Sequence, residues 1–147
     1  MSTAERRYGL ALSLLLAAFV GRVVAQLLQL ERPNAWLPPF AAWQSGLLPY
    51  PLLLALQALI IGLGLWAIVQ VYRGVPLPER LGHGLRTASV LYAGAMAVRL
   101  GLGLTVLRHV PWFAACLPTA FHFALAGFLW TLGMYSLPRR KLASDVR

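Results

Sequence analysis

The sequence predicts an all-α membrane protein, a bundle of four transmembrane helices, and two observations carry this prediction. Of the 147 residues, 59% are hydrophobic and only 12% are charged, which is about half the charged fraction of a typical soluble domain. The hydrophobic residues gather in four runs of about 20 residues, the length that an α-helix needs to cross a bilayer. The runs are continuous and rich in Leu and Ala rather than alternating, which argues against strands.

The four predicted helices cover residues 8–30, 50–72, 87–107 and 117–137, within a single integral membrane domain that spans 1–147. The connections are a loop over 31–49, a loop over 73–86 and a tail over 138–147. The first run also has the basic start of a secretory signal peptide. Arg22 would then lie directly at the cleavage point, so we interpret this run as the first membrane helix.

The basic residues predict how the bundle is oriented. Nine of the thirteen Lys and Arg residues lie at the two ends of the chain or in the loop over 73–86, whereas the other two loops hold one each. Short loops rich in Lys and Arg stay in the cytoplasm. We therefore predict a multi-pass protein of the cell (inner or plasma) membrane with both termini cytoplasmic. The net charge of +9 is explained by this topology, and no nucleic-acid partner is needed.

The predicted outer loop over 31–49 is unusually aromatic. Trp36, Phe40 and Trp43 are of the types that lie at membrane interfaces. Pro38 and Pro39 can begin a short helix that ends near Gly46. The segment is expected to lie on the outer surface of the bundle or to dip into it, and the alternative is an ordinary aromatic belt.

The two halves of the chain share a weak pattern. Arg22 and Arg99 each lie about eight residues before the outer end of a predicted helix. A proline and a tryptophan follow in each half, Pro33 with Trp36 and Pro111 with Trp112. The pattern indicates a possible tandem repeat of two helical hairpins in parallel orientation. Unrelated membrane hairpins share such features, so the alternative of no duplication stays open.

Six polar residues inside the predicted helices form the candidate ligand-binding site: Arg22, Gln26, Gln57, Tyr92, Arg99 and His122. Arg22 and Gln26 are four residues apart on one helix face, which Gln29 extends, and Tyr92 and Arg99 are seven apart on another. Gln57 and His122 fall in the outer third of their helices. We therefore expect these side chains to meet in the outer half of the bundle.

The two arginines need a partner that the predicted helices do not supply. The acidic residues Glu5, Glu31, Glu79 and Asp145 all fall in predicted tails or loops. An arginine at mid-helix costs about 2.5–3.5 kcal/mol to insert. Its counterion would be Glu31 folded back, a lipid phosphate, a carboxylate ligand or a neighbouring subunit. The alternative is that each arginine snorkels to the interface, with backbone carbonyls, Gln26 or Tyr92 as hydrogen-bond partners.

The same inventory argues against several classes of protein. Without clustered acids, the chain cannot hold Mg²⁺ as diphosphate enzymes do, and it lacks the intramembrane carboxylate usual in proton-coupled transporters. A single cysteine, Cys116, excludes an intrachain disulfide and a cysteine-based metal set. Of His83, His109 and His122, only the last lies within a predicted helix, whereas a membrane haem needs two facing histidines. No catalytic residue, metal site or cofactor is assigned.

Three hypotheses for the function remain. The first is a non-catalytic small membrane protein, an accessory subunit or a binder of lipid or another anionic ligand, with a cationic pocket in the outer half. Its partners would be membrane lipids, a second copy of the chain or a larger membrane complex. The second is an oligomeric transporter or channel component for a small anion or solute. The third is a quinone- or haem-binding redox subunit.

Overall fold

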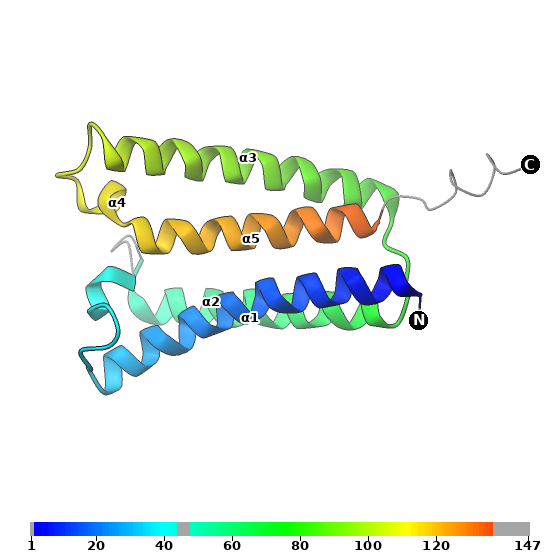
Figure 1. Cartoon of the computed structure of the whole chain (residues 1–147), viewed down its shortest axis with the longest axis horizontal. Helices are drawn as coiled ribbons and strands as arrows, with labels where there is room; N and C mark the ends of the chain where they lie inside the picture. Colours follow the sequence, from blue (N-terminus) through cyan, green and yellow to red (C-terminus); the bar gives the residue numbers. More distant parts are fainter. Residues whose placement is uncertain (1, 44–47, 137–147) are drawn as a thin grey trace, which may run out of the picture.

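In the computed structural model, which describes residues 2–43 and 48–136, all regular structure is helical. The long helices are α1 (Thr3–Glu31), α2 (Tyr50–Tyr72), α3 (Glu79–Leu104) and α5 (Cys116–Tyr135), joined by the short 3₁₀ helix η1 (Phe40–Trp43) and the short helix α4 (Pro111–Ala114) (Figure 1). All four long helices are long and apolar enough to cross a membrane. The prediction of an all-α protein with four such helices is confirmed.

The two ends of the bundle differ. The start of α1, the connector over 73–78 and the end of α5 lie together at one end, which we call the terminal end (Figure 1). The segments 32–43 and 105–115, which contain η1 and α4, lie at the opposite end, which we call the capped end. The two buried arginines point to partners in these capping segments, so the capped end is the part that positions the candidate site.

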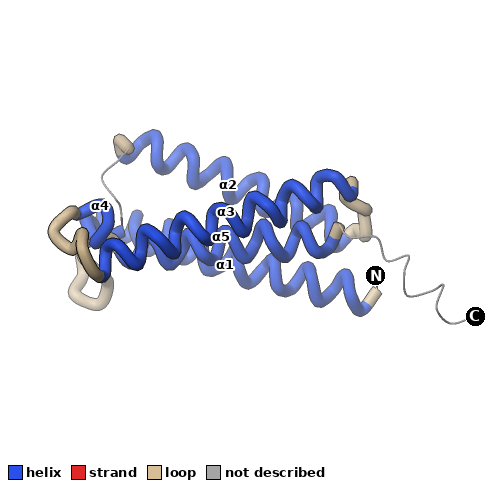
Figure 2. The backbone as a smooth tube through the Cα atoms, turned by 90° about the horizontal axis from the view of Figure 1, so that it is seen from above, coloured by secondary structure: helices blue, strands red, loops and turns tan. Residues whose placement is uncertain are grey.

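The long helices do not contact one another equally. α3 packs most extensively against α5, α5 packs against α1, and α1 packs against α2. The consecutive helices α2 and α3 are not among the well-packed pairs. α2 also diverges from α3 and α5 toward the capped end (Figure 2). The consecutive helices α2 and α3 are therefore packed less tightly than the other consecutive long helices, α1 with α2 and α3 with α5.

The start of α1 lies five residues before the predicted one, for a local reason. The backbone N–H of Glu5 donates to Ser2 Oγ (3.2 Å) and the backbone N–H of Ser2 donates to Glu5 Oε2 (2.7 Å). This reciprocal capping box satisfies two of the backbone donors that a helix start leaves free. Hydropathy marks the apolar part of a helix, whereas capping decides where the helix begins.

The helix α3 is shifted toward the N-terminus relative to the prediction of 87–107. It begins at Glu79, after Pro78, so the connector shrinks from the predicted 73–86 to 73–78. An acidic residue in the first turn favours this early start. The helix ends at Leu104, and Thr105 Oγ1 donates to the carbonyl of Gly101 (2.7 Å).

Two consequences follow for the predicted elements. The acids Glu5, Glu31 and Glu79 lie in end turns of helices rather than in tails or loops, which corrects their predicted placement. α2 has the predicted bounds, and α5 begins one residue before its predicted start. The predicted tail over 138–147, residue 137 and the loop residue Gly46 lie outside the described residues.

The hydrophobic core lies toward the terminal end and joins three helices. Its buried members come from α1, α2 and α5: Leu12, Leu16, Ala67, Ile68, Val71, Phe128, Leu132 and Tyr135. α3 joins this layer through a close backbone approach to α5, where Gly82 faces Gly133. Small residues at helix contacts are the usual means of close packing in membranes, where the lipid offers no hydrophobic driving force.

The close approach of α3 and α5 predicts an effect of substitution at Gly133. A Cβ there would lie 2.9 Å from the carbonyl oxygen of Gly82, and backbone cannot move aside easily. We expect Gly133→Ala to lower the stability of the bundle by about 1–3 kcal/mol, the usual cost of overpacking. Thermal unfolding of the purified protein in detergent measures this.

The matched control is Gly127→Ala on the same helix. Its Cβ would meet only the side chain of Leu15, with Cδ2 at 3.6 Å and Cδ1 at 3.8 Å, which are ordinary contacts. Alanine has the higher helix propensity, by about 1 kcal/mol, so the control should be neutral or stabilising. Equal Tm values for the two variants would contradict the assigned contact.

Candidate functional site

Four of the six predicted site residues are almost completely buried. Arg22 is 8% exposed, Gln26 1%, Gln57 3% and Arg99 5%. The other two, Tyr92 and His122, are half-buried. Polar side chains at this level of burial require partners, because an unpaired polar group in an apolar environment is costly.

Arg22, on α1, binds the segment that follows α1. Its Nη2 donates to the carbonyl oxygen of Trp43 in η1 (2.6 Å), and its guanidinium lies 5.8 Å from the ring centre of Phe121 on α5. Trp43 is itself buried, whereas Trp36 is 95% exposed. Of the alternatives for the aromatic loop, the structure therefore favours a segment that dips into the bundle, with Trp43 as the residue that enters it.

Arg99, on α3, binds the segment that follows α3 in the same way. Its Nε and Nη2 donate to the carbonyl oxygen of Trp112 in α4, at 3.2 and 2.7 Å. Its guanidinium also lies 4.3 Å from the ring centre of Trp112, within the range of a cation–π contact. The helix α4 was not predicted from the sequence. The only sequence signal for α4 is the proline at its first helical position, and such a proline is weak evidence by itself.

The two contacts are parallel in kind. In each half of the chain a buried arginine donates to the carbonyl of a tryptophan in a short helix that folds back over the bundle. The counterpart of Trp112 is thus Trp43, not Trp36, which corrects the pairing in the predicted repeat. The distances to the helix ends also differ, because Arg22 lies nine residues before the end of α1 and Arg99 five before the end of α3. A duplication of the hairpin stays a prediction.

The glutamines and the tyrosine–histidine pair extend the polar network. Gln57 Nε2 on α2 donates to Gln26 Oε1 on α1 (3.3 Å), so the pair links these two helices. A hydrogen bond of 2.5 Å joins Tyr92 Oη on α3 and His122 Nδ1 on α5. Gln29 does not join this group, because it binds backbone groups of the loop after α1.

A cavity of about 440 Å³ brings the site together. Five of the six predicted residues line it: Arg22, Gln57, Tyr92, Arg99 and His122. Gln26 does not line the cavity, but it accepts a hydrogen bond from Gln57, which does. The remaining wall is apolar or aromatic and includes Phe19, Trp112 and Leu125. The volume lies within the usual range of ligand sites, about 300–1,000 Å³, and we call this space the polar cavity.

The polar cavity carries positive charge without a matching anion. Within residues 2–43 and 48–136, no carboxylate forms an ion pair with Arg22 or Arg99. Glu31, predicted as one candidate counterion, is exposed at the end of α1. Over the same residues, Arg22 Nε, Gln57 Oε1 and Trp112 Nε1 are buried without a hydrogen-bond partner. The backbone carbonyls that we expected as alternative partners of the arginines are those of Trp43 and Trp112. They accept hydrogen bonds from the two guanidinium groups but carry no negative charge, so both positive charges stay uncompensated.

Metal ligands are not gathered in the described part of the chain. No group of three His, Cys, Asp or Glu side chains there is placed to hold an ion. His109 is exposed at the capped end, and His83 lies near the start of α3 at the terminal end. His122 makes the helix-to-helix hydrogen bond with Tyr92 that a structural histidine would make.

Comparison with known proteins does not assign the chain to a group: no protein-family model matches it, and no curated protein or solved structure is significantly similar to it.

The contact between Arg99 and α4 predicts a local effect. Arg99→Leu removes both hydrogen bonds to Trp112 and the cation–π contact, so α4 should open more often. We expect the amides of Phe113 and Ala114, which bond to the carbonyl of Val110, to exchange with solvent about tenfold faster or more. A hydrogen bond to a charged group contributes roughly 1.5–3 kcal/mol, and 1.4 kcal/mol corresponds to a factor of ten. Hydrogen–deuterium exchange measures the rate.

Arg108→Leu serves as the control for this exchange experiment. Arg108 lies nearer to α4 in the sequence, but its side chain is exposed and bonds only to the carbonyl of Thr105. Its removal should leave exchange in α4 unchanged. Equal acceleration in both variants would mean that Arg99 does not hold α4 in place.

Proposed function

We propose that the chain is a non-catalytic integral membrane protein that binds an anionic group, a phosphate or a carboxylate, between Arg22 and Arg99. One observation carries the proposal. Both guanidinium groups line one cavity, and no carboxylate in the described residues pairs with either of them. An anion held there would supply the charge that the surrounding side chains lack.

The chemistry of arginine supports an anion as the occupant. A guanidinium has five N–H donors in a fixed plane. Arg22 uses one nitrogen on the Trp43 carbonyl, and its buried Nε has no partner. Donors left in this way match the geometry of phosphate and carboxylate oxygens, which arginine binds through two parallel hydrogen bonds. Trp112 Nε1 adds a further free donor at the cavity.

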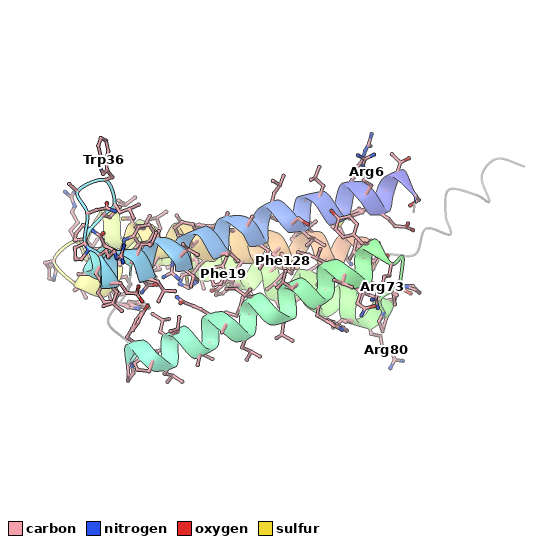
Figure 3. The ribbon with its side chains drawn as sticks, turned by 90° about the horizontal axis from the view of Figure 1, so that it is seen from below. Arg6, Phe19, Trp36, Arg73, Arg80 and Phe128 are labelled. Atoms are coloured by element: carbon pink, nitrogen blue, oxygen red, sulfur yellow. The ribbon has the colours of Figure 1, made fainter. Side chains whose placement is uncertain are left out.

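We further propose that the protein lies in the cell membrane with both termini in the cytoplasm, so that the polar cavity belongs to the outer half of the bundle. The distribution of basic residues supports this orientation. Arg6, Arg73 and Arg80 lie at the terminal end, and the exposed Trp36 lies at the capped end (Figure 3). Basic residues favour the cytoplasmic side and tryptophan the interface. Membrane lipids are then the most abundant source of an anionic group near the site.

The proposal predicts that the arginines determine which lipids stay with the protein. We expect Arg22→Gln and Arg99→Gln each to lower the ratio of anionic to zwitterionic lipid that co-purifies, by about tenfold. The loss of a charged hydrogen bond, roughly 1.5–3 kcal/mol, gives this magnitude. Phosphatidylglycerol and phosphatidylcholine, supplied in equal amounts and quantified by mass spectrometry of the purified protein, are the probes.

Two controls separate a site from general attraction to charge. Arg108→Gln removes one positive charge at the same end of the bundle, but from an exposed position outside the cavity, and it should leave the ratio nearly unchanged. Arg22→Lys keeps the charge and should retain part of the selectivity. Circular dichroism establishes that each variant is folded. A ratio that stays unchanged in both Arg→Gln variants would refute the proposal.

A further inference from the structure

A second cavity, which the candidate site does not include, continues from the polar one. It measures about 400 Å³. Its walls are almost entirely apolar, and Leu63, Leu81, Phe128 and Leu129 are among them. We call it the apolar cavity. Ile60, Tyr92 and Leu125 line both cavities, so the two spaces adjoin along one wall.

The two cavities follow one another along the bundle axis. The polar cavity takes its lining from the capped end, with Leu48, Trp112 and Pro118 among the wall residues. The apolar cavity reaches toward the terminal end, where Leu77 of the connector between α2 and α3 is part of its wall. Together they form an elongated space that is cationic at the capped end and apolar for the rest of its length.

The apolar cavity is open at its side. Its walls come partly from α2 and partly from α3, and these two helices are not among the well-packed pairs. The wall residues on this side keep much of their surface exposed: Leu63 is 59% exposed, Trp66 57% and Leu81 46%. In a membrane, this side meets the hydrocarbon chains of the bilayer.

We infer that the ligand is an anionic lipid, with its head group between Arg22 and Arg99 and one acyl chain in the apolar cavity, which it enters sideways between α2 and α3. The inference rests on the proposed function and adds the class of ligand. A soluble anion would occupy only the polar cavity, and a neutral lipid would leave both arginines uncompensated. An anionic amphiphile matches both parts of the space.

An acyl chain is the expected occupant because the apolar cavity opens to the bilayer interior rather than to water. An empty apolar cavity loses the dispersion contacts that its walls would otherwise make, and water does not enter a space without polar partners. Where such a cavity opens to the bilayer interior, the available filling is a lipid chain. The adjoining polar cavity then selects which lipid supplies the chain, because only an anionic head group compensates the two arginines.

The test uses lipids whose acyl chain carries a photoreactive diazirine. The full chain is reconstituted in phosphatidylcholine nanodiscs with one of three probes, each with the same labelled chain: phosphatidylglycerol, phosphatidylcholine or a free fatty acid. After irradiation, mass spectrometry maps the modified residues. We expect the phosphatidylglycerol probe to label Leu63, Leu81 and Leu129 severalfold more than Leu59 and Leu14. Leu59 and Leu14 are 58% and 64% exposed, close to the 59% of Leu63, but they line neither cavity.

The three probes distinguish which class of lipid supplies the acyl chain. Equal labelling of cavity and outward-facing residues by both anionic probes would overturn the inference. Preferential labelling by the fatty acid but not by phosphatidylglycerol would assign the site to a free carboxylate amphiphile. The phosphatidylcholine probe should label both sets of residues evenly, since its head group carries no net charge; cavity labelling equal to that of phosphatidylglycerol would overturn the role given to the arginines.

Two variants separate this inference from the proposed function. Leu129→Trp fills part of the apolar cavity and should reduce cavity labelling severalfold, whereas Leu59→Trp, on the outward face, should not. If Arg22→Gln and Arg99→Gln lower the co-purified phosphatidylglycerol while labelling stays evenly spread, the acyl-chain inference fails alone. If neither substitution changes the co-purified lipid, the proposed function fails as well.

Discussion

The organisation of the capped end depends on two guanidinium groups that are buried away from any carboxylate of the described chain. Each of them bonds to a tryptophan carbonyl, Arg22 to Trp43 and Arg99 to Trp112. Because a buried donor without a partner is costly, these bonds hold the short helices η1 and α4 against the bundle. The capping segments therefore do not merely connect long helices. The segment over 105–115 lines the polar cavity through Trp112, and the placement of both segments follows from the burial of the arginines.

The two ends of the bundle are packed differently: the helices are close together at the terminal end and enclose a cavity at the capped end. At the terminal end, Gly82 and Gly133 let α3 approach α5 closely, and the buried core joins α1, α2 and α5. At the capped end α2 diverges from α3 and α5 (Figure 2), and the polar cavity occupies the space between them. Close packing excludes ligands, whereas side chains such as Arg22 and Arg99 need room for a partner. The observed division of the molecule follows from where the small and the charged residues lie along each helix.

The sequence was sufficient to predict the four long helices, and five of the six polar residues that it grouped together line the polar cavity. Both predictions rest on simple constraints: the length of apolar runs and the cost of polar groups inside them. Three features could not be predicted in this way. The early start of α1 depends on local capping. The entry of Trp43 rather than Trp36 depends on how the loop folds back. The apolar cavity depends on the sparse contact between α2 and α3. This loose packing leaves no mark on composition or periodicity, because lipid-facing and cavity-facing leucines are alike in sequence.

The position of the two arginines also bears on what an anion would do for the fold. Arg22 belongs to α1 and Arg99 to α3, and these helices are not among the well-packed pairs. Each arginine is tied to its own capping segment, so the bonds within the chain hold each hairpin separately. Two like charges that line one cavity also repel each other, and the low dielectric of the interior strengthens this repulsion. An anion between the two arginines would attract both of them and would thereby link α1 to α3. A ligand that binds only the folded state stabilises it, and the stabilisation increases with the ratio of free ligand concentration to Kd. A bound lipid would therefore act as part of the packing at the capped end.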